Sequence, residues 1–235
     1  MAIYNDTGIN SEQSLESRYN NKAQERELYL ERARDCSELT IPTLIPQDGA
    51  TMAEEFETTY QGIGARGVNN LASKLLLSLL PPNAPFFRLA IDNFAVQEIE
   101  EDENLRTQID SGLVKIEKAV MDDIEMSNDR VAVFEALKHL IVGGNALLFV
   151  SKEGLRVFPL SQYVLERDPM GNVLEIITKE SIAYSALPED IRQAILSQQG
   201  EKKESDVCDL YTCVKRKPDH FMVHQEVKGI KLEES

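Results

Sequence analysis

The spacing of apolar residues predicts helices in the first part of the chain. Apolar side chains recur near helical spacing over residues 14–39, and acids and bases fill the positions between them. This pattern predicts a long helix of roughly 38 Å whose arginines, Arg26, Arg32 and Arg34, lie on a solvated face. Prolines at 42 and 46 end it. A second apolar stripe predicts an amphipathic helix that ends at Leu80, before two prolines; its members are Val68, Leu71, Leu75 and Leu79.

Two more helices follow a break at residues 81–85. Residues 86–91 begin with two phenylalanines and predict a short strand. Residues 98–125 hold ten acids against three bases, yet they keep an apolar stripe that predicts a helix, made by Ile109, Leu113, Ile116, Val120 and Ile124. We expect Asn128 to cap the next helix, which ends at Gly143–Gly144 and turns inward Val131, Phe134, Leu137, Leu140 and Ile141.

Beyond residue 145 the pattern changes to alternation with turn residues between the runs. Residues 146–150 with 155–159, 163–167 with 173–179, and 206–215 with 221–228 predict three β-hairpins. A short helix is expected over 187–196. The predicted fold class is therefore α+β, with long amphipathic helices followed by antiparallel hairpins. We take residues 1–235 as one region, mainly helical over 1–144 and mainly β hairpins with one short helix over 145–235.

Charge and composition narrow the classes of function. The formal net charge of −15 excludes a generally basic DNA-binding domain, although it leaves a local basic patch open. No basic stretch followed by an apolar run marks a signal peptide, and the longest apolar stretches are too short to span a bilayer. We therefore expect no membrane partner. The three cysteines, Cys36, Cys208 and Cys213, form no C-x-x-C pair and indicate reduced thiols.

Three glycines before the second helix imitate a dinucleotide-binding fingerprint. Gly62, Gly64 and Gly67 have the G-x-G-x-x-G spacing. The residues before them are rich in Glu and Thr rather than in the apolar types of a buried strand, and no acid lies about 20 positions on. A nucleotide-binding enzyme domain stays as an alternative, and it requires a parallel sheet. The hairpins argue against such a sheet, because parallel strands need long crossovers.

Other catalytic and metal-binding patterns are weak. His220 and His224, with Cys208 and Cys213, make the one metal-like cluster, but two histidines four positions apart on a strand lie about 13 Å apart, too far for one zinc ion. His139 is expected at a solvent edge or near a helix cap. Acidic pairs such as Asp122–Asp123 point in different directions on a helix and indicate a solvated face. We therefore expect no enzyme, no cofactor and no metal site.

Several segments, taken in order, resemble a known family. The chain is similar to the head-to-tail joining proteins (portal or connector proteins) of short-tailed bacteriophages over about residues 15–230. The segments that carry the resemblance are not catalytic, so its specificity comes from their order and coverage. They are the opening helix with 36–46, then 64–75, 134–148, 162–174 and 186–192.

The resemblance implies a structural role in the virion. It implies a wing-type portal region, a subunit of a ring that is dodecameric in the virion, and a location at a capsid vertex after assembly in the host cytoplasm. The implied partners are other copies of the chain, capsid and scaffolding proteins, terminase, tail proteins and double-stranded DNA passing without sequence specificity. The ATPase would belong to terminase. Portal subunits run considerably further than 235 residues, so we expect the chain to be the N-terminal part of one.

The second helix also provides the candidate contact residues. Arg66, Asn69, Asn70 and Lys74 lie off its leucine stripe, and we expect them to contact a neighbouring subunit or another layer of the domain. A simply solvated polar face is an equally weighted alternative. A third interpretation, a monomeric acidic adaptor, requires no ring.

Overall fold

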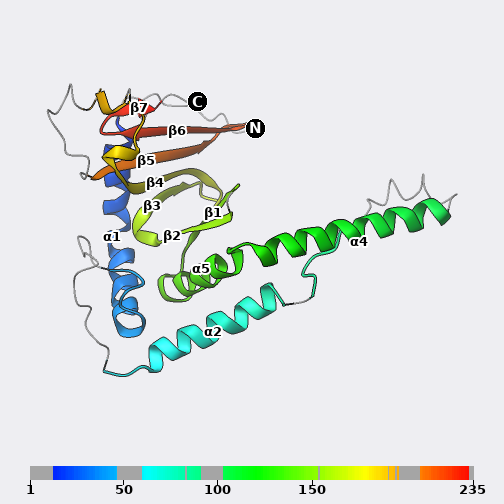
Figure 1. The fold of residues 1–235 in the computed structure, drawn as a ribbon. Coiled ribbons are helices and arrows are strands. Elements are labelled where there is room, and N and C mark those ends of the chain that lie inside the picture. Colours follow the sequence, from blue (N-terminus) through cyan, green and yellow to red (C-terminus); the bar gives the residue numbers. More distant parts are fainter. Residues whose placement is uncertain are drawn as a thin grey trace. The chain divides into compact units, whose positions relative to one another are not determined.

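The computed structural model of the chain describes residues 13–46, 60–82, 84–90, 103–152, 154–189, 191–193, 195 and 207–232. These residues divide into two compact units, shown in Figure 1. Unit 1 consists of Met1–Arg32 with Leu160–Ser235, and unit 2 of Ala33–Pro159. The long first helix, α1 (Leu15–Thr40), contributes residues to both. The predicted α+β fold class is confirmed, whereas the single wing-type region and its division near residue 144 stay predictions.

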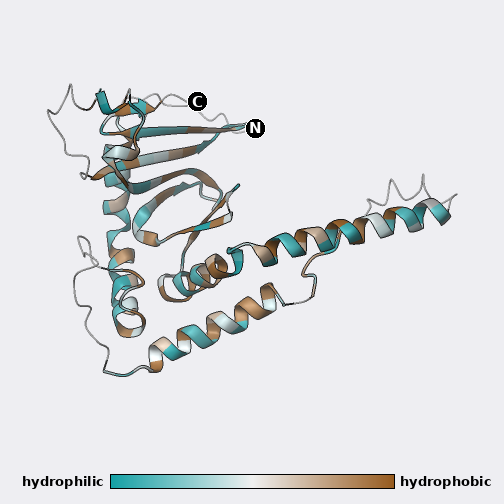
Figure 2. Ribbon diagram, in the orientation of Figure 1, coloured by the Kyte–Doolittle hydropathy of each residue, from teal (hydrophilic) through white to brown (hydrophobic). Residues whose placement is uncertain are grey.

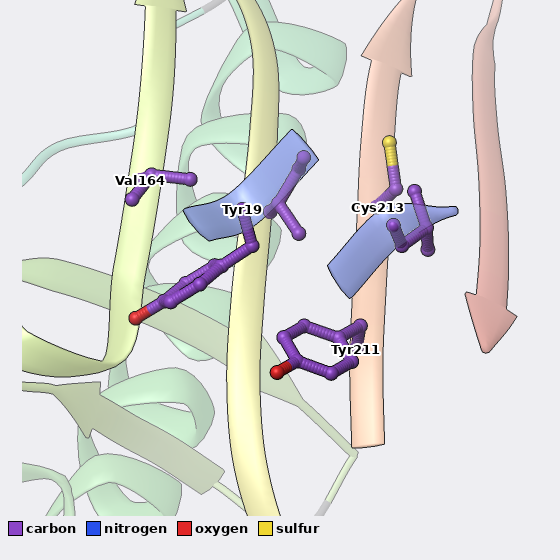
Figure 3. Close-up of a cluster of buried hydrophobic side chains, with 6 residues drawn as sticks. Tyr19, Val164, Tyr211 and Cys213 are labelled. Carbon is purple, nitrogen blue, oxygen red and sulfur yellow. The ribbon is translucent and has the colours of Figure 1, made fainter. Parts of the chain in front are cut away.

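Unit 1 is built on a five-stranded antiparallel sheet. Its strands lie in sequence order: β3 (Tyr163–Arg167), β4 (Val173–Ala183), β5 (Val207–Arg216), β6 (Phe221–Val227) and β7 (Ile230–Leu232). One row across four strands joins Val164, Ile177, Cys213 and His224. The first turns of α1 cover this face, where Leu15 and Tyr19 pack against the row and against Tyr211 (Figure 3). The second and third predicted hairpins are thereby confirmed.

A second cluster lies on the opposite face of the same sheet. The 3₁₀ turn Tyr184–Ala186 and the helical residues after it place Tyr184, Leu187, Ile191 and Ile195 over Cys208 and Val227. The described residues of the predicted 187–196 segment are consistent with a helix, while 190, 194 and 196 lie outside the described residues. Burying apolar side chains on both faces accounts for the stability of the sheet.

Strand β7 was not predicted. It pairs antiparallel with β6 through the two-residue turn Lys228–Gly229, whose φ angles are 50° and 80°. Two consecutive left-handed residues are the signature of a type I′ hairpin turn, and glycine takes the second position without strain. The Lys-Gly pair between two alternating runs was the signal that could have found this strand.

Unit 2 is organised around helix α5 (Asp129–Gly143). Helix α2 (Ile63–Leu79) packs on it and buries Val68 and Ala72, and helix α4 (Glu103–Met126) leads into it. The hairpin of β1 (Leu147–Ser151) and β2 (Gly154–Phe158) lies beside α5, where the Asp129 carboxylate accepts a hydrogen bond of 2.8 Å from Leu155 N. Gly144, with φ of 71°, ends α5 as predicted. Asn128 occupies the N-cap position, but its side chain makes no capping hydrogen bond.

Several apolar positions predicted to face inward are exposed. The affected side chains, which are between 40% and 66% exposed, are Leu71, Leu79, Ile116, Val120, Val131 and Leu140. The helices are present, but unit 2 offers each of them only a narrow contact. Figure 2 shows the apolar residues that recur along α2 and α4. The described residues therefore leave part of each stripe uncovered.

Three further expectations are wrong in the described residues. Residues 86–90 form no strand; instead Leu89 N donates to Glu117 Oε1 of α4 at 2.6 Å, and Phe86 packs on Phe87. His139 is buried rather than at a solvent edge. Arg34 is also buried rather than solvated, because the last turns of α1 pack inside unit 2. Residue 91 and residues 98–102 lie outside the described residues.

Candidate assembly surface

The four candidate contact residues all lie exposed on α2. Arg66, Asn70 and Lys74 line one shallow hollow of about 450 Å³, together with Ile63, Gly67 and Leu71. Asn69 does not line it. The structure thus brings three of the four side chains together and leaves the fourth on another side of the helix.

The hollow follows from the spacing of residues along α2. Positions 63, 66, 67, 70, 71 and 74 follow the i, i+3, i+4, i+7, i+8, i+11 pattern of one helix face, which lies away from the buried Val68 and Ala72. A Cβ added at Gly67 would meet no atom within 4 Å, which leaves a notch in the middle of this face. Ile63 and Leu71 remain 67% and 47% exposed beside it. The face therefore combines apolar side chains with amide and basic groups.

The electrostatics of α2 contrast with those of the whole chain. The helix has two bases, Arg66 and Lys74, and no acid, in a chain of net charge −15. Within the part of the chain that the structure describes, neither base makes an ion pair or a side-chain hydrogen bond. An unpaired basic strip with apolar neighbours can bind an acidic amphipathic surface, and it has no group suited to covalent chemistry.

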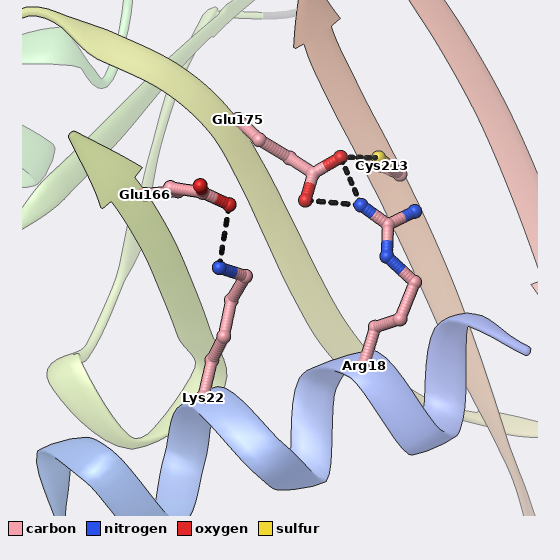
Figure 4. Close-up of polar contacts among 5 residues, drawn as sticks. All are labelled: Arg18, Lys22, Glu166, Glu175 and Cys213. Atoms are coloured by element: carbon pink, nitrogen blue, oxygen red, sulfur yellow. Dashed lines mark hydrogen bonds and ion pairs between the residues drawn. The ribbon is translucent and has the colours of Figure 1, made fainter. Parts of the chain in front are cut away.

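A separate polar cluster anchors α1 on the sheet of unit 1 (Figure 4). Arg18 Nη2 donates to both carboxylate oxygens of the buried Glu175, and the Cys213 thiol donates to Glu175 Oε1 at 3.4 Å. Lys22 pairs with Glu166 at 2.7 Å. Burial, with the Glu175 charge beside it, raises the pKa of Cys213 to about 12, so this thiol stays protonated and unreactive.

Two further contacts hold α1 on unit 1, one at its first residue and one at Arg26. The Glu226 carboxylate accepts Leu15 N at 3.1 and 3.2 Å and so caps α1 from strand β6. Arg26, predicted on a solvated face, instead donates to the backbone carbonyls of Leu160 and Tyr163. Sequence reasoning missed this cluster. The signal was the spacing of Arg18, Lys22 and Arg26, four residues apart on one face of a helix.

The three glycines do not form a nucleotide-binding turn. No strand precedes them at Tyr60 or Gln61, and every strand pairing that the structure describes is antiparallel, so the parallel sheet that the alternative required is not found. A Cβ on Gly64 would lie 2.8 Å from the Leu39 carbonyl oxygen at the end of α1. Gly64 therefore permits close packing of two helices, whereas Gly62 and Gly67 face open space.

The histidines and cysteines do not converge on a metal site. Cys213 lies opposite His224 in the β5–β6 ladder, and His220 lies in the exposed turn before β6. Over the described ranges, no three His, Cys, Asp or Glu side chains are grouped to hold a metal ion. None of the helices in those ranges combines the length and the apolar character needed to cross a bilayer.

Comparison with known proteins gives matches over nearly the whole chain. Residues 12–235 match the family described as bacteriophage head to tail connecting protein. The chain is 39% identical over 237 residues to the portal protein of Escherichia phage T7, covering 97% of this chain and 44% of that protein. It is 37% identical over 242 residues to the portal protein of Enterobacteria phage T3, covering 100% and 45%. For the portal protein of Enterobacteria phage SP6 the identity is 33% over 193 residues, covering 81% and 37%. The chain thus spans less than half the length of these relatives.

Proposed function

The chain belongs to the bacteriophage head to tail connecting protein family, and we propose that it acts within a structural portal subunit of a virion. In this role, copies of the subunit form a ring at one capsid vertex, through which DNA is packaged and later ejected. The observation that carries the proposal is the match over residues 12–235, together with relatives named portal proteins that align with nearly all of the chain. The role is one of assembly rather than catalysis.

The structure supports an assembly role through its exposed apolar surfaces. Large apolar side chains on α2, α4 and β1 remain accessible, among them Leu77, Val114 and Val150 at 56%, 62% and 77%. Exposed apolar surface of this extent marks sites of association between proteins. Ring formation uses such surfaces, because each subunit must present two different faces to its two neighbours.

The proposed partners follow from the same role. They are other copies of the subunit, twelve in the virion ring, then capsid and scaffolding proteins, terminase, tail proteins and double-stranded DNA. The net charge of −15 suits a channel wall that does not retain DNA, because like charges repel within a Debye length of about 8 Å at physiological salt. Terminase would supply the ATPase.

The proposal is tested by the oligomeric state of the full-length subunit. Native mass spectrometry with negative-stain electron microscopy of the same sample should show closed rings of about twelve copies, because a heterologous contact whose rotation closes generates a ring. A monomer at micromolar concentration would contradict the ring and favour the acidic adaptor. A complementation assay, in which a phage lacking the portal gene receives the full-length gene, should restore packaged DNA.

A further inference from the structure

Helix α4 carries an apolar stripe that the described part of the chain leaves partly exposed. Ile116 and Val120 lie four residues apart on one side of the helix and are 53% and 40% exposed, whereas Val114, at 62%, lies on the side of Met121, the buried residue of this part of the helix. Figure 1 shows α4 as a straight helix that approaches α5 at its C-terminal end. A helix of 24 residues extends about 36 Å, so packing on α5 at one end and the hydrogen bond from Leu89 N to Glu117 leave much of its surface exposed. Among the described residues of unit 2, no apolar partner covers Ile116 and Val120.

The apolar side chains at and beside the hollow on α2 are also exposed in the described part of the chain. Ile63, Leu71 and Leu77 are 67%, 47% and 56% exposed along one side of the helix, and Gly67 forms a notch between them. The opposite side of α2 already packs on α5. The hollow is elongated along the helix axis, because its lining residues run over three turns from 63 to 74. Such a groove accommodates the side of another helix.

The charges beside these two surfaces are opposite. On α4, Asp123 lies beside Ile116, and Asp110 lies about 80° from Val120 around the helix; both are exposed. One exposed base, Arg106, lies on the same side nearer the start of the helix. In the described part of the chain, neither carboxylate makes an ion pair. On α2, the two charges are the unpaired bases Arg66 and Lys74. The α4 stripe and the α2 hollow therefore both offer apolar side chains, and the charges beside them have opposite sign.

We propose that the α2 hollow of one subunit binds the α4 stripe of a second copy of this chain. The inference rests on the proposed ring and names the two surfaces that would join its subunits. Because the surfaces differ, the contact is heterologous and repeats around a closed ring. Pairing α4 with α4, or α2 with α2, would place like charges together and is disfavoured.

The main test exchanges the charges of the two surfaces in the full-length subunit. One variant carries Arg66→Glu with Lys74→Glu, and the other carries Asp110→Lys with Asp123→Lys. Each variant alone should lower the yield of rings about tenfold, because every interface then opposes like charges. All four substitutions in one chain should restore ring yield to within about twofold of wild type, because every interface is complementary again. An equimolar mixture of the two variants should restore it as well.

Matched controls separate a surface effect from a change in total charge. Asn69→Glu adds an acid to α2 outside the hollow, and Asp122→Lys reverses a charge on α4 on the side away from Val120. Both residues are exposed, so neither substitution should reduce ring yield. Circular dichroism of each variant should match wild type, because none of these side chains belongs to a core.

A second measurement tests proximity without altering charge. In a Cys36→Ser background, Leu71→Cys with Ile116→Cys should give a ladder of covalent oligomers under mild oxidation, whereas Asn69→Cys with Ile116→Cys should give monomer. Cys208 and Cys213 are buried and do not interfere.

The outcomes distinguish this inference from the ring itself. Wild-type rings together with unaffected single variants would overturn the α2–α4 pairing and leave the portal role standing. Loss of rings in the single variants without restoration in the four-substitution chain would also overturn the pairing. A wild-type subunit that forms no ring would overturn both.

Discussion

At the residue scale, the buried ion pair between Arg18 and Glu175 is the most demanding contact in unit 1. The side chains are 11% and 3% exposed, so each loses most of its hydration and depends on the other. The geometry is bidentate and charge-assisted, and the Cys213 thiol completes the carboxylate's partners. A single truncation therefore costs more than the removal of both partners.

This asymmetry can be measured by a double-mutant cycle. Arg18→Met leaves a buried carboxylate without its cation and should lower the free energy of unfolding by about 3–5 kcal/mol. Arg18→Met with Glu175→Met removes both charges and should recover most of that loss. Urea denaturation followed by circular dichroism gives both values. Equal losses in the two variants would show that the pair is not coupled as described.

A second residue-scale consequence concerns acid sensitivity. Burial lowers the pKa of His139 below 6.5, and its Nδ1 makes no hydrogen bond. The unfolded chain therefore binds a proton at a higher pH than the folded chain, so stability is full above about pH 6.5 and falls as the pH drops below it. Burial lowers the pKa of His224 in the same direction.

We expect His139→Met to reduce this acid sensitivity. The difference between urea midpoints at pH 7.5 and pH 5.5 should be smaller in the variant than in wild type, because one of the two imidazoles whose pKa is lowered in the folded chain no longer titrates. His220→Gln, in an exposed turn, serves as the control and should leave the difference unchanged. An unchanged difference in His139→Met would exclude His139 as a source of the acid sensitivity.

At the element scale, the sequence predicted helices and strands best where the apolar periodicity continued over the whole element and a turn residue ended it. Helix α1 was predicted over 14–39 and spans Leu15–Thr40, and the turn around Gly171 was found between its strands. The predicted faces were less accurate, because periodicity indicates that a stripe exists and does not indicate what covers it. Leu71 and Ile116 belong to correctly predicted helices and are nevertheless exposed. Burial depends on neighbours that a single chain does not supply.

The candidate site was likewise predicted only in part. Three of its four predicted residues share the α2 hollow, because helical spacing alone brings Arg66, Asn70 and Lys74 to one face. Asn69 was included because it is polar, but polarity alone does not indicate on which side of α2 a residue lies. The anchoring cluster of Glu175 and Glu226 could not be predicted, since it joins residues that are distant in sequence and depends on strand register.

The glycines at the start of α2 allow an element-scale test. Gly64→Ala should lower the free energy of unfolding by about 1–3 kcal/mol, because the new methyl group would meet the Leu39 carbonyl oxygen at 2.8 Å. Gly67→Ala should raise it by up to about 1 kcal/mol, because the site is open and alanine favours a helix. Thermal denaturation of both variants measures the contrast. Similar effects from the two substitutions would contradict the assignment of Gly64 as the packing position.

At the scale of the whole molecule, unit 1 is completed by two segments from opposite ends of the chain. Leu15 and Tyr19 come from α1, whereas Ile177, Tyr211 and Cys213 come from the sheet. The sheet face that α1 covers is apolar and holds the buried thiol of Cys213. Protection of this thiol from chemical modification therefore reports whether α1 is docked. Unit 2 lies between the two segments in sequence and has its own packing around α5.

Thiol labelling should reveal the state of this docking. In the folded chain, a maleimide should react rapidly with the exposed Cys36 and leave Cys208 and Cys213 unmodified. Tyr19→Asp places a charge in the apolar cluster and should open it, so that Cys213 becomes reactive at a rate at least about tenfold higher. Mass spectrometry of labelled peptides identifies the modified residue. Tyr60→Asp, which alters a fully exposed tyrosine, should leave the labelling unchanged.

The cap that Glu226 places on Leu15 has a consequence for how the chain is made. The two residues are 211 positions apart, so at 5–20 residues per second the ribosome emits the first turn of α1 roughly 10–40 s before its cap. During that interval the apolar side of α1 has no sheet to cover, while the segment of unit 2 emerges complete and can fold. Closure of unit 1 therefore waits until strand β6 has emerged, and until then the nascent chain exposes the amphipathic face of α1.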